Sequence, residues 1–359
     1  MSSVGGMVSA NGSVNERSRG RTGPYALPTE KEAPITVADQ TGPTVADVGE
    51  FPAIARAVAG RRQPRTTLVG PGHDSAVVAA SDGRIAVSTD MLVEGRHFRF
   101  DWSSPHEVGR KAVAQNGADV AAIGASPVAF VVGLGCPPET PASVLDEISA
   151  GLGEAAEALG AGVVGGDLVQ AREVIVSVTV LGDLGGRAPL LRSGARAGDT
   201  VALAGPVGRS AAGLALLLAE YDGHPDLVRA HRVPTPPYEA GPAAADAGAS
   251  AGTDISDGLL ADLGHVATAS GVAIDVDRTA ITPDEELVAA AADLGADPWE
   301  WVLSGGEDHA LAACFPPDAT LPAGWRRIGT VREGRGVTVD GQRPEGPGGW
   351  RSFSSTASR

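Results

Sequence analysis

The chain has 359 residues, of which 43% are hydrophobic and 20% are charged, and its formal net charge is −16. This length is enough for two domains with separate cores. The negative charge argues against nucleic acid or an anionic membrane as a partner, because both require a cationic face. Cys136 and Cys314 are far apart, which excludes a disulfide framework and a Cys-x-x-Cys zinc site. With no apolar run of 18 residues and no signal-peptide pattern, we expect a cytoplasmic protein.

Residues 1–45 are rich in Gly, Ser, Thr and Pro and have no hydrophobic period, so we expect a disordered extension. A first domain, residues 46–187, is predicted to follow. Its expected helices lie near residues 51–58, 107–125 and 143–160. Its expected strands are one that ends at residue 78, one from Arg84 to Asp90, one from 128 to 135, one from 163 to Asp167 and one from 174 to 181.

A second domain, residues 188–359, is predicted beyond a seam near residues 182–189. Its expected helices cover 208–220, a segment starting at Ser256, and 283–294; its expected strands cover 199–203, 272–277, 310–314 and 327–331. Strands and helices are mixed in both halves. The pattern therefore predicts an α/β (α+β) protein of two domains with mixed sheets and flanking helices.

The stretch Thr253–Gly258 contains more acidic groups than a helix start requires. Ser256 is predicted as the N-cap of a helix, and Asp257 in the first turn complements the helix dipole. Asp254 precedes the cap and has no helical role. Two carboxylates three positions apart, with a hydroxyl between them, are typical of sites for hard cations and phosphate oxygens.

Other carboxylates occur in similar surroundings. Each one alone is explained by a turn or a cap. Neighbouring carboxylates about 4 Å apart, however, repel by roughly 4 kcal/mol at an effective dielectric constant near 20. If the set converges, oxygen ligands without Cys or clustered His favour several Mg²⁺ ions. The set comprises Asp74, Asp90, Asp119, Asp167, Asp254 and Asp257.

Several enzyme classes are excluded by missing motifs. The only lysines are Lys31 and Lys111, and no Gly-Lys pair occurs, so a Walker P-loop is absent. The nucleophile elbow Gly-x-Ser-x-Gly and the His-Arg-Asp loop of protein kinases are also absent. Lys111 shares a predicted helix with Asp119 and is expected on its solvated face. After these exclusions, phosphoryl transfer on a less common scaffold is the enzyme class that remains.

Seven stretches, in order across residues 48–354, resemble the thiamine-monophosphate kinase family, in the superfamily of aminoimidazole ribonucleotide synthetase. They are Gly49-Glu50-Phe51, Ser88-Thr89-Asp90, Asn116-x-x-Asp119, Gly165-Gly166-Asp167, Arg192-Ser193-Gly194-Ala195, Asp254-x-Ser256-Asp257-Gly258 and Ser304-Gly305-Gly306-Glu307-Asp308. The resemblance implies ATP-dependent phosphorylation of thiamine phosphate to thiamine diphosphate, with ATP as co-substrate, several Mg²⁺ ions and a homodimer.

The resemblance also implies roles for individual residues. The implied metal ligands are Asp74, Ser88, Thr89, Asp90, Asp119, Asp167, Asp254 and Asp257; the implied ATP contacts are Gly166, Asp167, Arg192 and Ser256; the implied substrate contacts are His97, Glu307 and Trp350. Two positions depart from the family. His73 replaces the first of two adjacent Asp residues, and His309 follows Asp308 where the family usually has Tyr.

No catalytic base is expected, because the acceptor is a phosphate oxygen that is anionic at pH 7. Two alternatives remain open at this stage. One is another ATP-dependent enzyme of the superfamily with a different acceptor; the lack of a Cys before Cys136 and in the last residues disfavours the selenophosphate and hydrogenase-maturation branches. The other is a catalytically impaired nucleotide-binding sensor, which only His73 supports.

Overall fold

The computed structural model describes residues 42–71, 75–344 and 348–349. The strands in these ranges form three sheets, with orders β1-β2, β3-β6-β4-β5 and β12-β9-β11-β7-β10-β8. The strands are β1 (Thr67–Val69), β2 (Val77–Val78), β3 (Ala86–Val93), β4 (Ser126–Cys136), β5 (Gly162–Gln170), β6 (Ile175–Asp183), β7 (Thr200–Ala204), β8 (Ala251–Ile255), β9 (Ala273–Val276), β10 (Ala310–Phe315), β11 (Trp325–Arg332) and β12 (Gly336–Val339). Because parallel and antiparallel pairs occur in both larger sheets, the predicted mixed α/β class is confirmed.

The helices are interspersed with the strands along the chain. They are α1 (Val45–Val48), α2 (Glu50–Val58), α3 (Pro105–Ala122), α4 (Ala142–Ala158), α5 (Arg209–Leu218), α6 (Pro225–Arg232), α7 (Ala240–Asp246), α8 (Leu259–Ser270), α9 (Glu285–Leu294) and α10 (Pro298–Ser304), with two 3-10 turns, η1 (Arg192–Gly194) and η2 (Arg278–Ala280). Helices α6, α7 and α10 were not among the predicted elements. None of the helices in the described ranges is long and apolar enough to cross a membrane.

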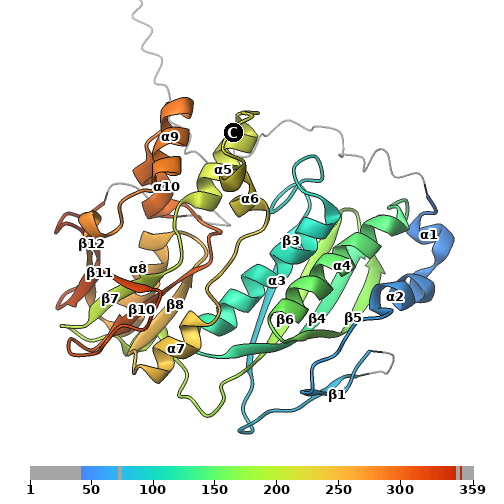
Figure 1. Cartoon of the computed structure of the whole chain (residues 1–359), viewed down its shortest axis with the longest axis horizontal. Helices are drawn as coiled ribbons and strands as arrows, with labels where there is room; N and C mark the ends of the chain where they lie inside the picture. The colour runs from blue at the N-terminus through green and yellow to red at the C-terminus, as the bar shows by residue number, and fades with distance from the viewer. Residues whose placement is uncertain (1–41, 72–74, 345–347, 350–359) are drawn as a thin grey trace, which may run out of the picture. The chain divides into compact units, whose positions relative to one another are not determined.

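Helix α3 is the element that brings the candidate site together. It begins with a capping box, in which the Ser104 side chain accepts from the Glu107 N–H and the Glu107 carboxylate accepts from the Ser104 N–H. Figure 1 shows α3 and α4 side by side on one face of the four-stranded sheet. The same helix also contacts β8 and β10 of the six-stranded sheet. Residues from both sheets can therefore meet along α3.

The alternation of β6 explains which face of its sheet is covered. Val176, Val178 and Val180 are fully buried and belong to the core that includes α3 and α4 residues, while the residues between them are partly exposed. A second core lies on the six-stranded sheet, where the rings of Phe315 and Trp325 meet edge to face at 5.5 Å.

Two predicted strand ends were wrong. Asp90 lies inside β3, which continues to Val93, and Asp167 lies inside β5, which continues to Gln170. Both strands are extended by regular pairing with a neighbour, β3 with β6 and β5 with β4. A local turn signal in the sequence is overridden when a complete ladder of hydrogen bonds is available.

The predicted limit of the N-terminal extension, residue 45, falls inside ordered structure. Thr44 caps α1 by accepting from the Asp47 N–H, and the Pro43 carbonyl accepts from the Ala142 N–H. Residues 1–41 lie outside the described ranges. The predicted division at residues 187/188 remains a prediction; the four-stranded sheet ends before it, at Asp183, and the six-stranded sheet begins after it, at Thr200.

Candidate functional site

Acidic side chains from four elements converge beside α3. Asp90 comes from β3, Asp119 from α3, Asp254 from β8 and Asp257 from the loop that follows β8. Their proximity is evident in their mutual electrostatic effects, because the charge of Asp254 acts on each of the other three. Ser88 joins this group by donating a hydrogen bond from its hydroxyl to the Asp119 carboxylate, at 2.6 Å.

The pKa values of these groups reflect their crowding. Burial raises the pKa of Asp119 to about 7, and the charges of Asp254 and Asp90 add to the effect. The pKa values of Asp90 and Asp257 are also raised, first by burial and then by Asp254. Each ionised carboxylate therefore opposes the ionisation of its neighbours, and a bound divalent cation would relieve this repulsion.

Helix α3 positions this group through its polar side chains. The Asn116 amide oxygen accepts from the Asp90 N–H at 3.1 Å, and its amide nitrogen donates to the Ala112 carbonyl at 2.8 Å. One turn further on, Asp119 receives the Ser88 hydroxyl. The predicted spacing of Asn116 and Asp119 on one face is therefore confirmed, and that face points to β3.

The loop before α8 differs from the prediction. Helix α8 begins at Leu259, and Ser256 is not its N-cap. Instead, one carboxylate oxygen of Asp262 accepts from the backbone N–H groups of Ser256, Asp257 and Gly258, at 3.0 to 3.1 Å. Asp262 thus replaces the capping side chain from within the helix and fixes the loop that carries Ser256 and Asp257.

Asp257, Asp262 and His265 offer ligand atoms that all lie within 4.8 Å of one another. Since the Asp262 oxygen that binds the loop is already occupied, Asp257 and His265 are the freer donors of this group. In the ranges that the structure describes, the other predicted carboxylate ligands form no group of three acidic, His or Cys residues within that distance. They interact as charges, not as a closed ligand cage.

The segment Glu307–His309 adds three ionisable groups at the start of β10. Glu307 and His309 have positive φ angles, 62° and 54°, which non-glycine residues rarely adopt. Their N–H groups donate to the carbonyls of Ser256 and Ile255, at 2.7 and 2.9 Å. These bonds hold the segment against the loop before α8 and offset the backbone strain.

The three side chains point to different partners. His309 is buried, and its Nδ1 lies 3.4 Å from Asp254 Oδ2. Asp308 is buried in the other direction, where its two oxygens accept from the N–H groups of Gly208 and Ser210 at the start of α5. Glu307 Oε2 lies 3.3 Å from the ammonium group of Lys111 and 3.4 Å from His231 Nδ1.

Lys111 corrects a prediction. Its side chain is 2% exposed, so it does not lie on a solvated helix face. The sequence contains no signal for this burial, because Glu107, Lys111 and Gln115 lie four positions apart and form a polar stripe along α3. His97, a predicted substrate contact, is connected to Lys111 through its carbonyl, which accepts from the ammonium group at 3.1 Å.

Three predicted site residues do not contact this group, and a fourth, Arg192, lies near it. Thr89 and Asp167 are exposed and lie on the sheet face opposite Ser88 and Asp90, as strand alternation and register require. Gly166 lies beside Asp167 on β5, where an added Cβ would lie 2.1 Å from the Val132 carbonyl oxygen. Arg192 is exposed on η1 and donates to the hydroxyl of Thr253, the residue before Asp254, at 3.2 Å, and its charge acts on Asp257.

Two predicted residues, Asp74 and Trp350, lie outside the described residues, as does His73. Among the described ones, sequence reasoning missed Asp262, His309 and Lys111. Asp262 could have been found from its place in the first turn of α8, since a carboxylate there can reach free N–H groups. No sequence signal indicates the contact of His309 with Asp254, because it joins residues 55 positions apart.

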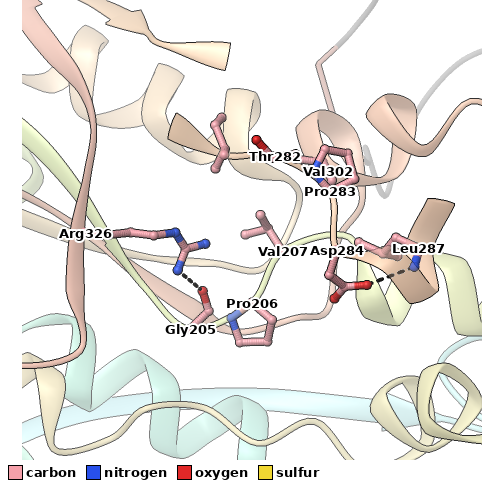
Figure 2. Close-up of a pocket in the computed structure, with 10 residues that line it drawn as sticks. Gly205, Pro206, Val207, Thr282, Pro283, Asp284, Leu287, Val302 and Arg326 are labelled. Carbon is pink, nitrogen blue, oxygen red and sulfur yellow. Dashed lines mark hydrogen bonds between the residues drawn. The ribbon is translucent and has the colours of Figure 1, made fainter. Parts of the chain in front are cut away.

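A separate cavity of about 290 Å³ contains none of the predicted site residues. Figure 2 shows Arg326 donating to the Gly205 carbonyl across one side of it, and Asp284 accepting from the Leu287 N–H on the other. The acidic group beside α3 is therefore distinct from this cavity.

Comparison with known proteins agrees with this arrangement. Residues 72–184 match the family described as AIR synthase related protein, N-terminal domain, and residues 196–342 match its C-terminal domain. Thiamine-monophosphate kinase of Mycobacterium tuberculosis is 57% identical over 87% of this chain and 93% of its own length. The enzyme of the same name from Corynebacterium glutamicum is 45% identical over 87% of this chain and 96% of its own length.

A solved structure shares the fold as well. AaThiL complexed with AMPPCP and TMP superposes with a TM-score of 0.72 at 33% identity, over 85% of this chain and 97% of its own. The two family-model matches together include every described element of the acidic group. The chain belongs to the thiamine-monophosphate kinase family.

Proposed function

We propose that the protein transfers the γ-phosphoryl group of ATP to the phosphate of thiamine monophosphate, which yields ADP and thiamine diphosphate. The observation that carries this proposal is the convergence of Asp90, Asp119, Asp254 and Asp257 from both halves of a chain that belongs to this family. In the transfer, the bond between the γ-phosphorus and its bridging oxygen breaks. A new bond forms between that phosphorus and an oxygen of the acceptor phosphate.

The acidic group suits Mg²⁺ better than other common metals. Its donors are carboxylate and hydroxyl oxygens, which are hard ligands, and burial together with the charge of Asp254 raises the pKa values of Asp90 and Asp119, so a bound cation would stabilise their ionised forms. When bound, Mg²⁺ would neutralise the phosphates of both substrates. Asp90, Asp119, Asp254 and Asp257 would hold these ions, with Ser88 orienting Asp119.

The residues of the chain act mainly by positioning. The acceptor oxygen is already anionic at neutral pH, so no side chain has to remove a proton from it. Asp262 and Asn116 hold the loop and the strand that present Asp257 and Asp90. In-line transfer then depends on holding two bound polyanions in the correct relative orientation. Such positioning lowers the activation free energy by several kcal/mol in well-oriented reactions.

The proposal is tested by comparing acceptors. We expect the purified protein to consume ATP with thiamine monophosphate and to be nearly inactive with unphosphorylated thiamine, whose hydroxyl would need a base. Product formation is followed by chromatography of thiamine diphosphate at fixed Mg²⁺. Comparable rates with free thiamine would overturn the acceptor, and no turnover with either would favour the sensor alternative.

The metal assignment predicts a specific loss in Asp254→Asn. Asp254 is buried on β8 and interacts with every other acid of the group, so its loss should weaken Mg²⁺ binding. We expect turnover to fall about 100-fold or more, with partial recovery at high Mg²⁺, while the circular dichroism spectrum stays unchanged. Turnover within about twofold of wild type would remove Asp254 from the metal site.

We also infer a homodimer and a cytoplasmic location. The face of the four-stranded sheet opposite α3 and α4 exposes Val87, Met91, Val131 and Val169, at 37% to 61%. An apolar face of this kind is typical of a protein–protein interface. Both cysteines are free and buried, and ATP is a co-substrate, which supports the reducing, nucleotide-rich cytoplasm.

A further inference from the structure

The described part of the chain contains one lysine, Lys111, and its ammonium group is almost completely buried. Taking an ammonium group out of water costs several kcal/mol unless it is paired and hydrogen-bonded. Two contacts provide this compensation, the Glu307 carboxylate at 3.3 Å and the His97 carbonyl at 3.1 Å. Both partners belong to residues that the family resemblance assigns to the substrate.

The two partners come from different parts of the chain. His97 follows β3, close in sequence to Lys111, whereas Glu307 is 196 positions away and precedes β10. The carbonyl of His97 therefore fixes the ammonium group locally, and the ammonium group in turn fixes Glu307. The His97 imidazole itself is used in another way, since its Nδ1 accepts from the Val93 N–H at 3.0 Å.

Glu307 has contacts from several elements, although its side chain is 31% exposed. Its N–H donates to the Ser256 carbonyl at 2.7 Å, and its φ is positive. His231, which is buried, approaches the same oxygen as Lys111 and lies 3.1 Å from the Ser210 hydroxyl. Lys111 is the fixed positive charge among these partners, because His231 has its pKa lowered to about 3 by burial and is neutral near pH 7.

A structural role alone does not account for this pair. Only one partner of the pair is buried, because the Lys111 side chain is 2% exposed and the Glu307 side chain is 31% exposed. The Glu307 carboxylate therefore stays partly accessible to a cationic group, such as the thiazolium ring of the substrate, while Lys111 holds it from the protein side.

We propose that Lys111 is a positioning residue for thiamine monophosphate, which holds the Glu307 carboxylate in place for the substrate contact that the family resemblance implies. The inference rests on the proposed function, because it takes thiamine monophosphate as the acceptor. It adds a residue of α3 to the substrate side of the site. Helix α3 then positions both reactants, with Lys111 acting on the acceptor and Asp119 on the metal-bound phosphates.

The test is a double-mutant cycle of Lys111→Met and Glu307→Gln, with KM measured separately for thiamine monophosphate and ATP. We expect each single variant to raise KM for thiamine monophosphate about tenfold, with KM for ATP within about twofold of wild type. Since Lys111 acts through Glu307, the KM of the double variant for thiamine monophosphate should also be raised about tenfold. Independent effects of the two substitutions would instead multiply to a rise of about a hundredfold.

Arg187→Met is the matched control. Arg187 also carries a cation that pairs across the predicted division, with Asp246 at 2.8 Å, but it lies outside the site. We expect this variant to leave both KM values unchanged. If it raised KM for thiamine monophosphate as Lys111→Met does, the effect would be a general loss of an ion pair, and the proposal would be overturned.

Stability is measured alongside, because Lys111→Met leaves Glu307 without its cation. Its melting temperature should fall, and the double variant should recover part of the loss. If Lys111→Met does not fold, Glu307→Gln and the double variant still decide the question. Equal KM values of Glu307→Gln and the double variant for thiamine monophosphate support the proposal. A KM of the double variant that is a further tenfold higher contradicts it. Wild-type protein that does not phosphorylate thiamine monophosphate would instead refute the proposed function, before any variant is compared.

Discussion

At the scale of single residues, the carboxylates of this protein differ more in environment than in sequence context. Asp254 and Asp257 surround a serine in one short motif, yet Asp254 is buried on a strand and Asp257 is half-buried in a loop. Asp308 follows Glu307 directly but faces α5 and not the substrate side. Neighbouring acidic residues thus lie in different environments, Asp254 and Asp257 in the acidic group and Asp308 at the start of α5.

Asp308 gives a pH prediction. Burial raises its pKa to about 7, although the N–H groups of Ser210 and Gly208 act in the opposite direction. A carboxyl group with a raised pKa contributes stability that is complete below the ordinary value of 3.8 and is lost as the pH rises toward 7. Asp308→Asn should therefore melt at a lower temperature, since one acceptor is lost, but with a shallower decline between pH 4 and about 7.

Thermal melts of wild type and Asp308→Asn across this pH range, without Mg²⁺, measure the difference. Asp119 and Asp262 also have pKa values raised to about 7, but they are unchanged in the variant and cancel in the comparison. Parallel curves for the two proteins would show that Asp308 ionises at its ordinary pKa.

At the scale of elements, the start of α8 depends on the backbone as much as on Asp262. Gly258 has φ of 129°, and an added Cβ would lie 2.7 Å from the Ser304 carbonyl oxygen. A side chain here would be strained in its backbone and would also push the loop away from α10. The position of Asp257 depends on that loop.

Gly258→Ala should therefore reduce both stability and turnover. Strain of about 1–3 kcal/mol corresponds to a fall in melting temperature of roughly 4 °C or more in a chain of this size. Gly264→Ala is the matched control on the same helix, because an added Cβ there meets nothing within 4 Å. Alanine is the better helix former, so the control should be as stable as wild type or slightly more stable. A Gly258→Ala protein with wild-type melting and turnover would contradict this account of the loop.

At the scale of the whole molecule, the open face of the four-stranded sheet is the feature that the described chain leaves without a cover. Val87 is 61% exposed and Met91 51%, on the edge strand β3. These side chains alternate with Ser88 and Asp90, which face α3. One strand therefore contributes to the candidate site with one face and to the inferred dimer with the other.

Val87→Glu should convert the proposed dimer to monomer, because a charge would be buried in an apolar interface. Val288→Glu is the control; Val288 is 50% exposed on α9 and belongs to another surface. Sedimentation velocity of both variants and wild type gives the result. A dimeric Val87→Glu protein, or a monomeric wild type, would place the interface elsewhere or remove it.

The sequence alone determined the class of the fold and indicated the carboxylates Asp90, Asp119, Asp254 and Asp257, because both depend on local patterns. Hydrophobic periods located α3, α4, α5, α9 and most strands, and the order of short motifs identified the family. Spacing on α3 placed Asn116 and Asp119 together, since three positions on a helix share a face. Predictions failed where a local signal competed with a long-range ladder, as at Asp90 and Asp167.

Only the tertiary structure decided which groups meet. The pairs Lys111–Glu307 and Asp254–His309 join residues 196 and 55 positions apart, and no periodicity carries such information. The same limit applies to the two faces of β3 and β5. Sequence alternation separates the faces, but sheet order and helix packing decide which face is buried, so Thr89 and Asp167 could be assigned to the open side only once α3 and α4 were placed on the other.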